Sequence, residues 1–135
     1  MNASTRKIES FRLAALPEAA PFASAVRAGG LVHVSGQIGH RPGEMRLVEG
    51  GLEAEARQAL DYMRQALELA GSSLDRVIKC TVFFADVKDF QAFNEIYRTY
   101  FPNRLPARSG VEVRALALGA RIEIECVALA GEAES

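Results

Sequence analysis

The sequence has few of the features that mark specialised protein classes. It contains two cysteines and two histidines, and its formal net charge is −1. This near-neutral charge gives no overall attraction to nucleic acid or to an anionic membrane. No apolar run approaches the roughly 20 residues that a membrane-spanning helix needs. Residues 1–7 lead into a mixed segment without an apolar core, which argues against a secretory signal. We therefore expect a cytoplasmic protein that does not bind membranes.

The two cysteines and two histidines do not suggest a metal site. Cys80 and Cys126 each lie inside an apolar, strand-like run, which is typical of reduced thiols in the core of a cytosolic protein. Their spacing to His33 and His40 fits no standard zinc pattern. We expect no metal to be bound.

The length and the balance of residue types are those of one globular domain. The chain has 135 residues, 49% of them hydrophobic and 24% charged. A chain of this length can bury a core without disulfides or metals. We expect a single domain over residues 1–135, with residues 1–7 frayed.

Alternating apolar residues predict several strands. Gly29 and Gly30 separate two such runs and predict a hairpin between them. The run 77–85 is apolar on both of its faces, which predicts a central strand covered on both sides. The predicted strands are residues 8–13, 22–28, 31–35, 77–85, 106–114 and 121–129.

Helical periodicity appears twice. Between Leu52 and Ala70, apolar residues recur at steps of three and four, and Gly71 suits a C-terminal cap. A second stripe consists of Phe90, Phe93, Tyr97 and Phe101. The order strands, helix, strand, helix, strands predicts an α+β fold, with a mixed β-sheet and two helices packed on one face.

The predicted strand 106–114 contains a candidate binding residue. Side chains alternate along a strand, so Arg108, Gly110 and Glu112 share one face, with a gap where Gly110 lacks a side chain. A guanidinium group offers a planar fork of donors that matches a carboxylate. Two interpretations stay open: Arg108 binds a small anion, or it forms an ordinary ion pair with Glu112 or Glu123.

The last predicted strand has one charged face. Ile122, Ile124 and Cys126 alternate with Arg121, Glu123 and Glu125. The charged face is either exposed to solvent or used by a partner subunit or a binding site.

An ordered set of segments resembles one family. It resembles the RidA family of reactive-intermediate (imine) deaminases, also called YjgF and also labelled endoribonuclease L-PSP. The match runs from about residue 20 to residue 130. It rests on Pro21-Phe22, Val34-Ser35-Gly36-Gln37-Ile38, Gly71 to Val77, Asp89 to Tyr97, Pro106-Ala107-Arg108-Ser109 with Val111-Glu112-Val113, and Ile122-Glu123-Ile124-Glu125.

The resemblance implies a fold, an assembly and a reaction. The fold is the chorismate-mutase-like (YjgF) type, and three copies form a homotrimer whose sheets make a central barrel, with sites in the clefts between subunits. The reaction is the hydrolysis of 2-imino acids, or their enamine tautomers, to 2-keto acids and ammonia. It requires no metal or organic cofactor.

The resemblance also implies roles for particular residues. Arg108 matches the arginine that binds the substrate carboxylate, and Glu123 matches the acid that helps to activate water. Ser35 and Gly36 match positions that line the pocket. The helical Asn94 also matches a recurrent residue, which we interpret as structural rather than part of the site.

Two positions depart from the family pattern. Phe22 stands where a tyrosine is common, which removes a hydroxyl but leaves a ring that can pack against a substrate. Gly110 stands where a cysteine is common, which removes a thiol and should widen the pocket.

Two other functions are open. The departures at Phe22 and Gly110 fit a non-catalytic module that binds a keto acid or another small carboxylate. The ribonuclease label would require a local basic patch, formed by Arg104, Arg108, Arg114 and Arg121. The slight negative net charge disfavours the ribonuclease, so we expect no nucleic acid partner.

Overall fold

The computed structural model describes residues 7–131, so the fraying expected for residues 1–7 lies, except for Lys7, outside the described part of the chain. Within it, strands form one sheet in the order β1-β2-β3-β6-β4-β5. β4 and β5 run parallel, and every other neighbouring pair runs antiparallel. The strands are β1 (Glu9–Phe11), β2 (Ala25–Ala28), β3 (Leu31–Gln37), β4 (Val77–Phe84), β5 (Ala107–Glu112) and β6 (Ile122–Leu129).

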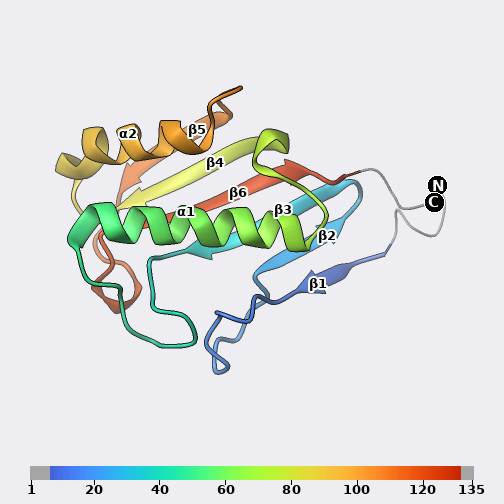
Figure 1. The fold of residues 1–135 in the computed structure, drawn as a ribbon, viewed down its shortest axis with the longest axis horizontal. Helices are drawn as coiled ribbons and strands as arrows, with labels where there is room; N and C mark the ends of the chain where they lie inside the picture. The colour runs from blue at the N-terminus through green and yellow to red at the C-terminus, as the bar shows by residue number, and fades with distance from the viewer. Residues whose placement is uncertain (1–6, 132–135) are drawn as a thin grey trace.

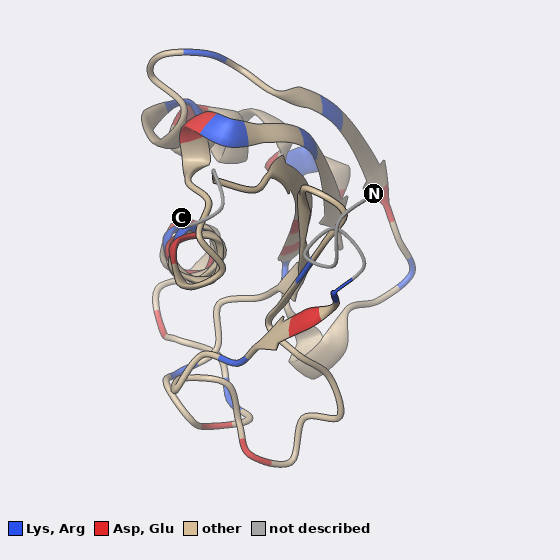
Figure 2. Ribbon diagram, turned by 90° about the vertical axis from the view of Figure 1, so that its right-hand side faces the viewer, with Lys and Arg blue, Asp and Glu red and all other residues tan. Residues whose placement is uncertain are grey.

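Two α-helices, α1 (Gly51–Leu69) and α2 (Phe90–Tyr100), lie across the same face of this sheet (Figure 1). Figure 2 shows α1 end-on beside the sheet. We call the side of the sheet under the helices the helix face and the other side the open face. Short 3₁₀ turns connect these elements: η2 (Leu74–Arg76), η3 (Val87–Asp89) and η4 (Ala117–Gly119). The predicted α+β fold, with a mixed sheet and two helices on one face, is confirmed.

The helix face holds the hydrophobic core. The stripe predicted for α1 is buried, and Leu60, Met63 and Leu67 are fully enclosed. Gly71 follows the helix with φ = +82°, a conformation that suits glycine, and its N–H donates to the carbonyl of Glu68. The predicted helix end is therefore confirmed. No helix in the described residues is long and apolar enough to cross a membrane.

The prediction that β4 is covered on both sides is wrong for the single chain. Cys80 and Val82 are buried on the helix face, whereas Thr81 and Phe83 are only half-buried on the open face. A shift in register between Val77 and Lys79 also turns Ile78 toward solvent. Both helices lie on one face, so the apolar open face of β4 has no cover from them.

The segment before β2 also differs from the prediction. A strand was expected from Phe22, but β2 begins at Ala25, and residues 17–22 form a turn around Arg12. The Arg12 guanidinium donates to four backbone carbonyls, which are those of Pro17, Glu18, Ala20 and Phe22. These bonds hold the backbone in a bend that alternation of apolar residues cannot reveal. The hairpin of β2 and β3 around Gly29 and Gly30 is confirmed.

The two cysteines generate a test of this core. Cys80 and Cys126 are buried, unbonded cross-strand neighbours of β4 and β6. Burial raises the pKa of both thiols, which keeps them protonated and therefore poor nucleophiles. We expect a thiol-specific colorimetric reagent to label neither cysteine in the native protein and both after unfolding in guanidinium. Rapid labelling under native conditions would contradict this packing.

Candidate functional site

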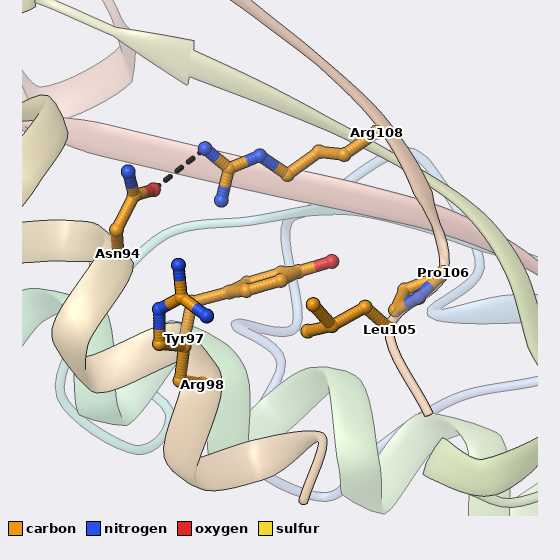
Figure 3. A pocket seen from close by; sticks show the side chains of 6 residues that line it. All are labelled: Asn94, Tyr97, Arg98, Leu105, Pro106 and Arg108. Carbon is orange, nitrogen blue, oxygen red and sulfur yellow. Dashed lines mark hydrogen bonds between the residues drawn. The ribbon is translucent and has the colours of Figure 1, made fainter. Parts of the chain in front are cut away.

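Arg108 projects from β5 onto the helix face and lies over aromatic rings of α2. Its guanidinium carbon is 5.3 Å from the ring centre of Phe90, 5.6 Å from that of Phe93 and 4.7 Å from that of Tyr97. Its Nη2 donates to Oδ1 of Asn94 at 2.6 Å, as Figure 3 shows. The rings attract the cation through their π faces, and the amide fixes its orientation. Arg108 is thus held in place without being neutralised.

Neither ion pair considered for Arg108 is present. The Glu112 carboxylate instead accepts the backbone N–H of Val87 at 2.8 Å, and Glu123 lies on the open face. Within residues 7–131, no carboxylate lies within 4 Å of the Arg108 guanidinium. A guanidinium group has five N–H donors, and the bond to Asn94 uses one of them. The group therefore has the capacity to bind a carboxylate.

A pocket of about 180 Å³ opens beside Arg108, between α2 and the start of β5. Figure 3 shows its lining side chains, with the Tyr97 ring below the Arg108 guanidinium. The lining contains two guanidinium groups and an amide but no carboxylate, so it favours an anion. The lining residues are Asn94, Tyr97, Arg98, Leu105, Pro106 and Arg108.

Tyr97 supplies a neutral wall to this pocket. Its side chain is buried, and its hydroxyl has no hydrogen-bond partner of ordinary geometry in the described residues. Burial raises its pKa strongly, and the neighbouring Cys80 thiol adds to the effect. Tyr97 is therefore an uncharged phenol at physiological pH and does not compete with a bound anion for Arg108.

Gly110 lies on the same face as Arg108, as predicted, but the expected gap beside it is filled. A Cβ atom at Gly110 would lie 3.3 Å from a ring carbon of Phe84 and 3.6 Å from one of Phe90. The glycine allows these two rings to approach the strand. The prediction that Gly110 widens the pocket is wrong within one chain, because aromatic side chains occupy the space.

Glu123 belongs to a second group of residues, on the open face of β6. A Cβ atom at Gly36 would overlap with Oε2 of Glu123 and lie 2.8 Å from its Cδ, so the glycine makes room for the carboxylate. The register of β3 against β6 shifts between Val34 and Gln37, which places Ser35 and Gly36 in a β-bulge. The close approach of Gly36 and Glu123 thus occurs at an irregularity in β3.

Ser35 connects this bulge to the turn that carries Phe22. Its Oγ donates to the carbonyl of Ala23 at 2.7 Å, and its N–H donates to that of Ser24 at 3.0 Å. Phe22 itself is 48% exposed. Four of the predicted site residues thus belong to one connected region, namely Phe22, Ser35, Gly36 and Glu123.

The environment of Glu123 suits proton transfer. Burial raises the pKa of its carboxyl group, and the negative charge of Glu125 raises it further. A carboxyl group with a raised pKa exchanges protons closer to neutral pH than an exposed glutamate does. Glu123 can therefore act as a general base for a water molecule.

The two groups lie on opposite faces of the sheet. On β5, Arg108 is next to Cys80 and contacts α2, which places it on the helix face. On β6, Ile122 and Ile124 are buried beneath the helices, so Glu123 between them points to the open face. A single chain therefore does not bring Arg108 and Glu123 to the same small molecule.

Residues of α2 that were not predicted as part of the site complete the surroundings of Arg108. Asn94 was interpreted as structural, and Tyr97 only as part of an apolar stripe. The available signal was their spacing, because residues 90, 93, 94 and 97 fall on one side of a helix. Among residues 7–131, no group of three or more histidine, cysteine, aspartate or glutamate side chains is placed to hold a metal ion.

Comparison with known proteins identifies extensive similarity. Residues 13–130 match the family described as Endoribonuclease L-PSP. The 2-iminobutanoate/2-iminopropanoate deaminase of Homo sapiens is 46% identical over 111 residues, which cover 82% of this chain and 81% of the human protein.

Solved structures show the same fold. The crystal structure of yeast Mmf1 superimposes with a TM-score of 0.86 at 35% identity, covering 92% of this chain and 99% of that one. The crystal structure of E. coli TdcF with bound serine gives a TM-score of 0.82 at 31% identity, covering 90% of this chain and 98% of that one.

Two glycines test the close approaches around this region. A Cβ atom at Gly39 would lie 2.5 Å from Cα and 2.7 Å from the carbonyl oxygen of Glu55, and this backbone cannot move aside. We expect Gly39→Ala to lower the free energy of unfolding by about 1–3 kcal/mol through overpacking. The new Cβ atom in Gly36→Ala would meet only the flexible Glu123 side chain. The free energy of unfolding should therefore stay within about 1 kcal/mol of the wild-type value. Urea denaturation would measure both values, and equal losses would contradict the geometry.

Proposed function

The chain belongs to the endoribonuclease L-PSP family, as its resemblance to the RidA proteins indicated, and on this premise we propose that it is an imine deaminase. It hydrolyses 2-imino acids and their enamine tautomers to 2-keto acids and ammonia. The proposal is supported by the human relative, whose name describes deamination of 2-iminobutanoate and 2-iminopropanoate.

The observation that carries this proposal is the unneutralised guanidinium of Arg108. Every 2-imino acid has a carboxylate next to the reacting carbon, and Arg108 can bind it through two parallel N–H donors. Asn94 and the ring of Tyr97 hold the guanidinium in place before the substrate arrives. Binding thus fixes the imine carbon at a short, defined distance from Arg108.

Glu123 supplies the proton transfer. Water adds to the carbon of the protonated imine and forms a C–O bond while Glu123 accepts a proton from the water. Glu123 then passes this proton to the amino nitrogen of the resulting carbinolamine. The C–N bond breaks and ammonia leaves, while the hydroxyl group gives its proton to the Glu123 carboxylate and becomes the C=O group of the keto acid. A single positioned acid–base group contributes a factor of about 10² to 10⁴. This is sufficient for an imine, because free imines already hydrolyse in water.

The site requires two copies of the chain. Since Arg108 and Glu123 lie on opposite faces of one sheet, we propose that the Arg108 of one copy meets the Glu123 of another. In a homotrimer the open faces line a central barrel and the sites lie in clefts between subunits. Val111 and Leu129 on the open face are 45% and 49% exposed, and such an assembly would cover this apolar surface.

In this assembly Phe22, Ser35 and Gly36 would line the cleft on the Glu123 side. Gly110 would support the Arg108 side through the rings of Phe84 and Phe90. The cytoplasmic location and the absence of a cofactor stay predictions.

A non-catalytic module that binds a small carboxylate is a second candidate. It is favoured by Phe22, which lacks a hydroxyl, and Gly110, which lacks a thiol. The similar E. coli protein with bound serine supports a site for a small carboxylate in either case. Calorimetry that detects keto-acid binding, together with no acceleration of imine hydrolysis, would favour this candidate.

The ribonuclease candidate has less support. Of the four arginines considered for a basic patch, Arg121 pairs with Asp89 at 2.8 Å. Pairing with Asp89 reduces the local positive charge that phosphate groups would need.

Substitution of Arg108 tests the deaminase directly. An amino-acid oxidase generates the imine in the assay, and keto-acid release is followed. Arg108→Ala removes a charge-assisted contact of about 1.5–3 kcal/mol, so kcat/KM should fall roughly 10- to 150-fold. Arg108→Lys keeps the positive charge but lacks the paired N–H donors of a guanidinium group, so its kcat/KM should lie between those of Arg108→Ala and the wild type. The exposed Arg114→Ala serves as the control. Unchanged kcat/KM in Arg108→Ala would reject the assignment.

The pH dependence tests the role of Glu123. The proposed base is the ionised carboxylate, so the rate should rise with pH through the pKa of Glu123. Burial and the charge of Glu125 place this pKa above the ordinary glutamate value. Glu125→Gln removes a negative charge that disfavours ionisation, so the pKa should fall and the acid limb of the kcat/KM profile should move to lower pH. A limb that stays in place, or moves to higher pH, would contradict this role.

A further inference from the structure

We infer that the preferred substrates carry a second acidic group, which Arg98 binds at the other end of the Arg108 pocket. This inference rests on the proposed function and names its substrate class, the 2-imino dicarboxylates. Arg98 and Arg108 line one pocket, and Asn94, which accepts a hydrogen bond from Arg108, comes from the same helix as Arg98 (Figure 3). Arg98 follows Asn94 by four residues, so one helical turn separates the amide that holds Arg108 from the second arginine.

The charge of Arg98 is not neutralised within the described chain. Arginines on α1 pair with acids one turn away: Arg57 lies 3.2 Å from Glu53, and Arg64 lies 3.4 Å from Glu68. Arg98 has no carboxylate within 4 Å in residues 7–131. The nearest acid in sequence, Glu95, lines a different groove, between α1 and α2. Arg98 therefore borders the pocket without the glutamate partner that Arg57 and Arg64 have on α1.

Positive charge continues beyond Arg98. A second hollow of about 450 Å³ shares Arg98 and Leu105 with the first and is also lined by Arg104. Arg104 is bound to backbone carbonyls, which leaves its charge uncompensated by a carboxylate. No aspartate or glutamate lines either hollow. The side chains that line the two hollows therefore offer positive charge and no carboxylate to an anion beside Arg108.

A monocarboxylate would satisfy only one end of this pocket. It would neutralise Arg108 and leave Arg98 unpaired beside it. A dicarboxylate of similar length places a negative charge near each guanidinium, and each charge-assisted contact contributes to affinity. Leu105 and the Tyr97 ring supply apolar surface for the methylene groups between the two carboxylates. The geometry thus distinguishes acids by their distal group.

A matched pair of keto acids tests this inference. 2-Oxoglutarate and 2-oxopentanoate both have five carbons and differ in the distal carboxylate. Isothermal titration calorimetry on the whole protein should show that 2-oxoglutarate binds on the order of 10-fold more tightly, as expected for one additional charged hydrogen bond. The preference should weaken with added salt, because Arg98 is exposed.

Arg98→Gln should bring the ratio of the two affinities close to one, whereas the control Arg114→Gln should preserve it. Equal affinities in the wild-type protein, binding of neither acid, or a preference that survives in Arg98→Gln would overturn the inference. The proposed function fails separately, if imines of monocarboxylic amino acids are not hydrolysed faster in the presence of the protein. Hydrolysis of these imines without a preference for the dicarboxylate would reject only the role of Arg98.

Discussion

The alternation of side chains across a sheet covered by helices on one side determines the chemistry of this molecule. Both α-helices lie on one face, so a residue on β5 or β6 either points into their packing or away from it. Arg108 points toward α2, where the ring of Tyr97 and the amide of Asn94 hold it. Glu123 points away, into the space that Gly36 leaves free. The separation of these two groups follows from strand periodicity together with the placement of both helices on one face.

This separation explains why the open face is unlike an ordinary solvated surface. Glu123 is half-buried with a raised pKa, and the apolar Phe83 lies opposite it on β4. If another copy of the chain covered this face, it would bury the apolar surface and enclose the Glu123 carboxyl group. In that arrangement the assembly and the catalytic site depend on the same contact.

Sequence periodicity was sufficient to predict the fold and the faces of β5 and β6. It placed Arg108 with Gly110 and separated Ile122 from Glu123, because alternation is a local property of the chain. Periodicity did not predict local structure that depends on contacts between residues distant in the sequence. The bend before Ala25 depends on the carbonyls that gather around Arg12. The filled space at Gly110 depends on the rings of Phe84 and Phe90. Asn94 was interpreted as structural for the same reason, since its helical spacing does not identify Arg108 on another element as its partner.

The most direct test of the account asks whether Arg108 and Glu123 act from different copies of the chain. Arg108→Ala and Glu123→Gln, each strongly impaired alone, would be unfolded, mixed in equal amounts and refolded together. If each site takes its arginine from one copy and its glutamate from the next, random assembly restores about one quarter of the sites. The account predicts recovery of imine hydrolysis near this level. Mixed protein as inactive as either parent, although it assembles normally, would contradict it.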